Sequence, residues 1–133
     1  MTPMASLRER RRAERIPYSE KIDVTWAAGT FQAYSADLSE AGIFIETTIL
    51  LPVDTSVRVQ FKVSSADRRH SVRAAGRVAR QVSTAAAAGR GLPPGLGIEF
   101  EEVPDGEKAL SHFIGERLRV MLSATLGHSK NEG

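Results

Sequence analysis

Arginine side chains are concentrated in one short segment near the start of the chain. Residues 8–15 read RERRRAER, with five arginines in eight positions, and Ile16 and Pro17 follow directly. The planar guanidinium group binds phosphate through two parallel hydrogen bonds and pairs in a similar way with the O6 and N7 atoms of guanine. Three interpretations are open from this segment alone: a solvated basic tail, an arm that binds nucleic acid, or a clamp for a specific small anion.

A second group of polar residues lies at positions 37–42, which read DLSEAG. A carboxylate such as Asp37 can accept hydrogen bonds from the N1 and N2 donors of guanine, and Ser39 can donate or accept at short range. Gly42 allows a close approach of backbone to a ligand, or a positive φ. The same residue types dominate ordinary turns, so a strand that ends in a polar turn is the alternative interpretation.

Together, the two segments resemble the signature of the PilZ domain family. That signature is R-x-x-x-R in the entrance segment and [DN]-x-S-x-x-G at a strand end. The matching positions in this chain are Arg11, Arg15, Asp37, Ser39 and Gly42. The resemblance runs from about residue 8 to about residue 122 and includes GLGIEF at 95–100. Each half of the signature is weak alone, and the two together are more specific.

The resemblance implies a receptor for cyclic di-GMP, a bacterial second messenger with two phosphates and two guanines. Arg11 and Arg15 would form the clamp, and Asp37, Ser39 and Gly42 would form a rigid polar edge that reads the base. In this family an arginine directly before the R-x-x-x-R pair, here Arg10, is associated with an intercalated pair of ligand molecules. Many members also have a tryptophan near position 80. Arg80 stands there in this chain, and it could stack on a guanine or face solvent.

The elements that must position these residues are predicted mainly as strands. Hydrophobic and polar residues alternate most clearly over 57–63, as they do in a strand with one buried face. The other predicted strands lie at about 21–26, 31–38, 43–48, 70–83 and 95–100. Residues 83–95, rich in alanine, glycine and proline, are predicted to form a mobile loop. After Pro104 the hydrophobic period becomes about 3.6, which predicts a helix over about 105–122.

These elements predict an all-β fold: a six-stranded antiparallel, split β-barrel with a C-terminal α-helix. Residues 1–15 are predicted to be a flexible basic arm, 16–126 to be the barrel with its helix, and 127–133 to be a disordered tail. The chain has 133 residues, which is enough for one domain with a hydrophobic core.

Composition excludes several functional classes. Lys and Arg number 18 and Asp and Glu 16, so the net charge is only +2, which argues against general binding of nucleic acid. There is no cysteine, and the three histidines lack the spacing of metal ligands. We therefore predict no metal or cofactor site. Ser39 has no evident histidine partner for a hydrolase triad, and we predict that the protein is not an enzyme. No apolar run is long enough to cross a membrane, and we predict a cytoplasmic protein without membrane insertion.

The predicted function is therefore a non-catalytic cyclic di-GMP receptor and adaptor. Its arginine arm would close over one ligand molecule or an intercalated dimer and present a new surface to an effector protein. A PilZ-like adaptor that binds its partner without ligand is the alternative. Binding of nucleic acid through the arm is a third hypothesis and predicts a steep dependence on salt.

Overall fold

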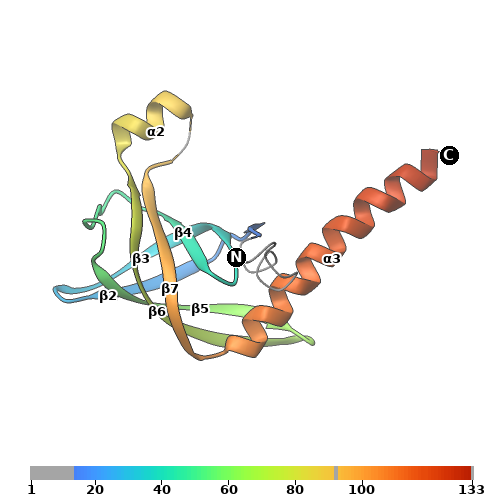
Figure 1. The fold of residues 1–133 in the computed structure, drawn as a ribbon, viewed down its shortest axis with the longest axis horizontal. Coiled ribbons are helices and arrows are strands. Elements are labelled where there is room, and N and C mark those ends of the chain that lie inside the picture. Colours follow the sequence, from blue (N-terminus) through green and yellow to red (C-terminus); the bar gives the residue numbers. More distant parts are fainter. Residues whose placement is uncertain (1–13, 92, 133) are drawn as a thin grey trace, which may run out of the picture.

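The structure is a computed structural model that describes residues 14–91 and 93–132. Within these residues, seven strands form one antiparallel sheet in the order β1-β3-β2-β5-β6-β7-β4. The strands are β1 (Ile16–Pro17), β2 (Lys21–Trp26), β3 (Gly29–Leu38), β4 (Gly42–Glu46), β5 (Ser56–Ser65), β6 (Arg68–Val82) and β7 (Gly95–Asp105). Because β3 also pairs with β4, the six strands β2 to β7 close into a ring (Figure 1). This confirms the predicted fold class.

The hydrophobic core lies inside this ring, and the alternation of side chains along each strand produces it. On β5, the side chains of Val57, Val59, Phe61 and Val63 are buried, while the residues between them face outward. The helix α3 (Glu107–Glu132) contributes Leu110, Phe113 and Ile114 to the same core. The first turns of α3 therefore cover one opening of the ring, and the rest of the helix extends away from it (Figure 1).

The short helix α2 (Thr84–Arg90) lies where a mobile loop was predicted, so that prediction was wrong. The Ser83 side chain caps the helix by accepting a hydrogen bond from the Ala86 N–H at 3.1 Å. The helix ends at Gly91, whose φ of 68° is left-handed. Alanine has the highest helix propensity, so a capped alanine run between β6 and β7 forms a helix despite its glycine- and proline-rich flank.

The boundaries of the C-terminal elements also differ from the prediction. Strand β7 continues to Asp105, and Gly106, with a φ of 81°, separates it from α3. The helix begins at Glu107 and continues to Glu132 instead of covering 105–122. Residues 107–132 contain no proline, so the backbone hydrogen bonds continue after the hydrophobic period fades.

Strand β1 was not predicted, and it is short because only two residues pair with β3. Residues 1–13 of the predicted basic arm, including Arg10 and Arg11, lie outside the described residues. In the part of the chain that the structure covers, no helix combines the length and the apolar character needed to cross a bilayer.

Candidate functional site

The DLSEAG segment forms the tight connection between β3 and β4. Ser39 is buried, and its Oγ accepts hydrogen bonds from the N–H groups of Ala41 at 3.0 Å and Gly42 at 3.1 Å. The Ala41 carbonyl accepts a bond from the Phe100 N–H at 2.8 Å, which ties the connection to β7. The Ser39 hydroxyl is therefore directed to the backbone of its own loop, where it fixes the loop shape.

Gly42 allows two strands to approach each other closely. A Cβ atom at this position would lie 2.3 Å from the carbonyl oxygen of Ile98 on β7. The φ of Gly42 is not left-handed. The sequence predicts either a close approach to a ligand or a positive φ at this glycine. In the structure, the close approach is to the β7 backbone.

Arg15 and Asp37 are brought together by the pairing of β1 with β3. Pro17 lies directly opposite Asp37, and Ile16 lies opposite Leu38, so the residue before β1 is held beside the end of β3. The Arg15 Nη1 donates to Asp37 Oδ1 at 2.5 Å, and the two side chains are 44% and 33% exposed. A pair this exposed contributes about 1 kcal/mol or less. A ligand with suitable donors and acceptors can therefore replace it at low cost.

A row of directly opposed residues crosses four strands on the outside of the ring. Asp37 on β3 pairs with Phe44 on β4, Phe44 with Gly97 on β7, and Gly97 with Arg80 on β6. Directly opposed residues in a sheet place their side chains on the same face. We refer to these four residues as the platform. It crosses three strand spacings, or about 14 Å.

The middle of the platform is flat because Gly97 has no side chain. The Arg80 side chain lies across this gap: a Cβ on Gly97 would be 2.9 Å from its Cγ. The Arg80 Cζ is 5.3 Å from the centre of the Phe44 ring, which is the geometry of a cation–π contact. The platform therefore carries a carboxylate at one end and a guanidinium group on an aromatic ring at the other.

The predicted site residues are thus found at three kinds of position. Arg15 and Asp37 contact each other, and Arg80 lies on the same face, while Ser39 and Gly42 shape the backbone beneath it. Phe44 was missed by sequence reasoning. It lies between Ile43 and Ile45, which face the core, so its opposite parity was the available signal that it faces outward.

Comparisons with known proteins found a matching family model and similar solved structures. The family model for the PilZ domain matches residues 9–128. A structure of the Bacillus subtilis inhibitor of motility (MotI/DgrA) is similar, with a TM-score of 0.68 and 15% identity over 86% of this chain. This chain spans only 56% of the length of that protein. The PilZ domain of CeSA from a cellulose-synthesizing bacterium matches with a TM-score of 0.46, 18% identity, 84% of this chain and 99% of its own. No curated protein matches the sequence.

Proposed function

Because the chain belongs to the PilZ domain family, we propose that it is a non-catalytic receptor for cyclic di-GMP that signals through a partner protein. The family is one of cyclic di-GMP receptors, and its members are generally not enzymes. In this proposal the ligand binds the platform, and the R-x-x-x-R arginines hold its phosphates. A cytoplasmic location remains a prediction.

The row of the platform residues is the observation that supports this proposal best. Asp37 presents a carboxylate that is about one third exposed and can accept hydrogen bonds from guanine N1 and N2. Arg80 is exposed, and its flat guanidinium group lies over the Phe44 ring with Cζ 5.3 Å from the ring centre, so it can also stack on a purine. Gly97 lets the Arg80 side chain cross from β6 to the Phe44 ring, beside Asp37. A planar base with donors on one edge suits this arrangement.

In the proposed mechanism, ligand binding exchanges one set of partners for another. Without ligand, Arg15 bonds to Asp37. A guanine that donates to Asp37 would release the Arg15 fork toward a phosphate, and Arg11 would supply a second fork from the preceding segment. Charge-assisted hydrogen bonds contribute about 1.5–3 kcal/mol each, so several of them can outweigh the lost ion pair and the ordering of the segment.

The same ion pair favours one alternative function. Because Arg15 and Asp37 form an ion pair, neither of these two charges needs a ligand to neutralise it. A PilZ-like adaptor that recognises its partner without cyclic di-GMP would use this state directly.

Calorimetric titration with cyclic di-GMP tests the proposal. We expect a Kd in the micromolar range, which corresponds to about −8 kcal/mol. The Arg11→Ala/Arg15→Ala variant should weaken binding by about 100-fold or more, the loss expected when two charge-assisted contacts are removed. Arg8→Ala/Arg12→Ala removes the same charge from the same segment and should change the Kd by less than about threefold, an effect of screened, nonspecific attraction.

Two results would contradict the receptor proposal. One is the absence of binding at ligand concentrations of about 50 µM, well above the expected Kd. The other is an equal loss of affinity in both double variants, which would indicate nonspecific attraction by the arginine segment. The stoichiometry of the wild type and of Arg10→Ala would decide between one bound ligand and an intercalated pair.

A further inference from the structure

A small polar cavity of about 180 Å³ lies where three parts of the chain meet. These parts are the segment that follows β1, the β5–β6 hairpin and the first half of α3. The side chains that give the cavity its chemistry are Tyr18, Glu20, Lys62, Arg69, Phe113 and Arg117. We refer to it as the basic pocket. It shares no residue with the platform.

The basic pocket carries an excess of positive charge. Three cations and one carboxylate line it, so their formal sum is 3 − 1 = +2. Glu20 accepts a hydrogen bond from Arg69 at 3.2 Å. Lys62 and Arg117 have no carboxylate partner among the residues that the structure describes. Two cations without a carboxylate partner at one small cavity favour an anionic group between them.

Packing and hydrogen bonding hold the backbone and the aromatic rings beneath these cations in place. Tyr18 is buried, and its hydroxyl donates to the Lys62 carbonyl oxygen at 2.5 Å. The Tyr18 ring makes edge contacts with Phe61 and Phe113, with centroid distances of 5.9 and 5.8 Å. The Arg117 Cζ lies 5.5 Å from the centre of the Phe113 ring. An anion would therefore meet cations on a preformed scaffold, which lowers the ordering cost of binding.

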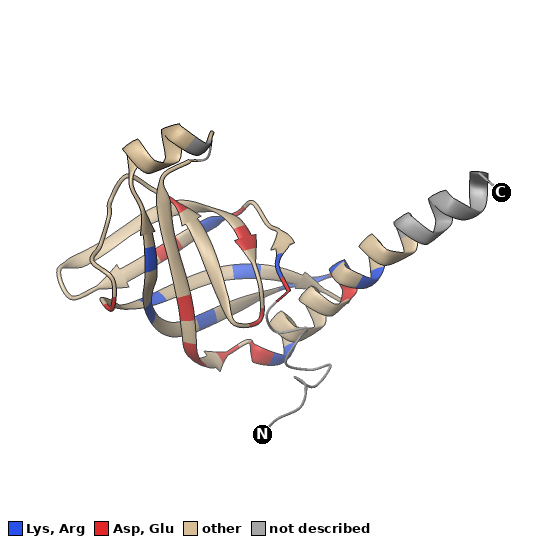
Figure 2. Ribbon diagram, turned by 45° about the horizontal axis from the view of Figure 1, so that its top comes forward, with Lys and Arg blue, Asp and Glu red and all other residues tan. Residues whose placement is uncertain are grey.

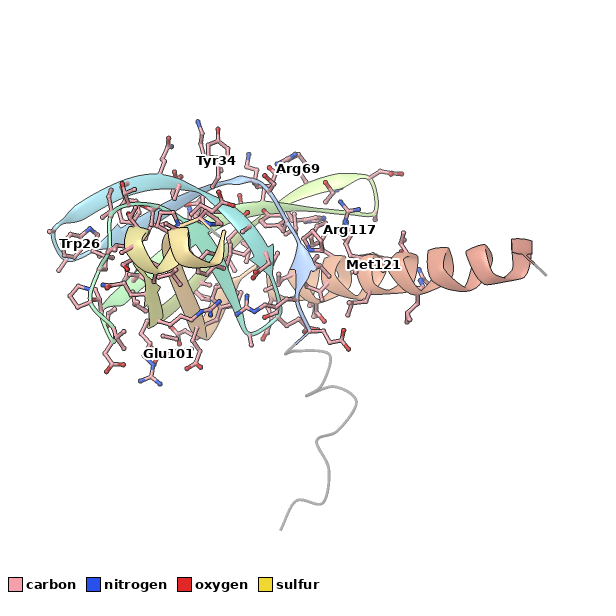
Figure 3. All side chains as sticks on the ribbon, turned by 90° about the horizontal axis from the view of Figure 1, so that it is seen from above. Trp26, Tyr34, Arg69, Glu101, Arg117 and Met121 are labelled. Atoms are coloured by element: carbon pink, nitrogen blue, oxygen red, sulfur yellow. The ribbon has the colours of Figure 1, made fainter. Side chains whose placement is uncertain are left out.

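The surface around the basic pocket has the character of a protein interface. Figure 3 shows Tyr34 and Arg69 projecting from one side of the ring, whereas Glu101 projects from the opposite side. Tyr34 is 57% exposed and lies directly opposite Lys21 on β2. Exposed tyrosine and arginine are the residue types that most often dominate binding energy at protein interfaces. Carboxylates are instead frequent on β7, at Glu99, Glu101, Glu102 and Asp105 (Figure 2).

We propose that the basic pocket is the docking site for an acidic segment of a partner protein, with one carboxylate side chain entering between Lys62 and Arg117. The small cavity fits a single side chain, and the neighbouring Tyr34 and Lys21 offer further contacts to a peptide. The Glu20 carboxylate within the pocket and the acidic β7 strand disfavour a continuous polyanion such as nucleic acid. This inference goes beyond the proposed function and does not depend on cyclic di-GMP.

Fluorescence anisotropy with a fluorescein-labelled hexaglutamate peptide tests the proposal on the full chain, at low salt and without cyclic di-GMP. The Lys62→Glu/Arg117→Glu variant should weaken peptide binding by about tenfold or more, because it reverses both unpaired charges. Arg58→Glu/Arg73→Glu is the matched control. These two exposed cations also lack carboxylate partners among the described residues, but they line a different cavity. The control should change the affinity by less than about threefold, the effect of net charge alone.

A variant that is expected to bind the peptide more tightly complements this test, because loss of folding cannot produce a gain in affinity. Glu20→Gln removes the carboxylate that engages Arg69, and it should tighten peptide binding by about threefold, the effect of one exposed charge. Circular dichroism would establish that each variant remains folded.

Three results would overturn the docking proposal. They are no binding of the peptide by the wild type, an equal loss in the two double variants, and tighter binding of a labelled oligothymidine than of the peptide. The last result would assign the surface to nucleic acid. None of them bears on the receptor proposal, which is tested separately with cyclic di-GMP.

Discussion

The platform and the basic pocket both present arginine side chains with partners in the chain, but they differ in how many cations lack a carboxylate. Arg15 bonds to Asp37, and Arg80 lies over Phe44. In the basic pocket, Lys62 and Arg117 face the cavity without a carboxylate. A ligand at the platform must therefore compete with internal contacts, which requires a specific set of donors and acceptors. An anion that enters between Lys62 and Arg117 breaks no ion pair, so that site should be more permissive.

The largest expected effect comes from Gly42→Ala, which disturbs the backbone under the platform. The added Cβ would meet the Ile98 carbonyl oxygen at 2.3 Å, and β4 and β7 would have to separate. We expect the free energy of unfolding to fall by about 3 kcal/mol, measured by urea denaturation. Gly89→Ala in α2 is the control. Nothing lies within 4 Å of its Cβ position, so it should stabilise the domain by up to about 1 kcal/mol. Equal stabilities for the two variants would contradict the close approach.

A smaller effect is expected from Asp37→Asn, which should separate the two sites functionally. The substitution removes the charge that holds Arg15 and replaces one acceptor with a donor. Affinity for cyclic di-GMP should fall by about 30-fold, or about 2 kcal/mol. Hexaglutamate binding at the basic pocket should stay unchanged. Titration of one protein preparation with both ligands would check this, and a parallel loss of both activities would refute the independence of the sites.

Tyr18→Phe addresses the scaffold of the basic pocket. It removes the hydrogen bond to the Lys62 carbonyl, and the free energy of unfolding should fall by about 1 kcal/mol near neutral pH. Burial raises the pKa of Tyr18 far above its ordinary value, and the Glu20 carboxylate raises it further. The unfolded chain therefore loses this proton first, from about pH 10. The stabilising contribution is complete below that pH and is lost as the pH rises above it.

The corresponding measurement is urea denaturation at about pH 8 and about pH 10.5, on either side of the start of tyrosine titration in the unfolded chain. The wild type should lose stability between the two values, and Tyr18→Phe should lose less. Tyr34→Phe changes an exposed tyrosine and should retain the wild-type decline. A decline in Tyr18→Phe as large as that of the wild type would assign the alkaline sensitivity to other groups.

The smallest effect is expected from Arg80→Ala at the far end of the platform. The variant removes one stacking group, and affinity for cyclic di-GMP should fall by about threefold, in keeping with an exposed cation–π contact. Arg80→Trp should restore the affinity, since an indole ring also offers a flat face. Calorimetry on the two variants would check this. If Arg80→Ala bound as tightly as the wild type, Arg80 would be a solvent-facing residue.

Most strands could be predicted because their hydrophobic residues alternate, as Val57, Val59 and Phe61 do on β5. Strand β1 could not be predicted, since two residues carry no period and its pairing depends on β3. For α2, the serine cap before an alanine run was a usable signal, but the surrounding glycines and prolines suggested a loop.

The candidate site was predictable only in part. Its motif residues could be found from their spacing, and the family resemblance joined them. The platform as a row could not be found, because it requires the non-sequential order of β3, β4, β7 and β6. The basic pocket was not predictable for a similar reason. Lys62, Arg69 and Arg117 come from three separate elements, and only the packing of α3 against the hairpin brings them to one cavity.

The two-residue strand β1 also sets the effective concentration of the arginine segment beside Asp37. The buried Ile16 side chain fixes one end of that segment beside Asp37. Four residues of chain reach at most about 14 Å, so the Cα of Arg11 cannot move farther than this from that of Arg15. A tether of this length gives an effective concentration in the millimolar range. If the chain were cut before Arg15, the separated arginine peptide would have to be added at millimolar concentration to restore ligand binding. Strand β1 therefore provides a high local concentration of this segment as well as its position.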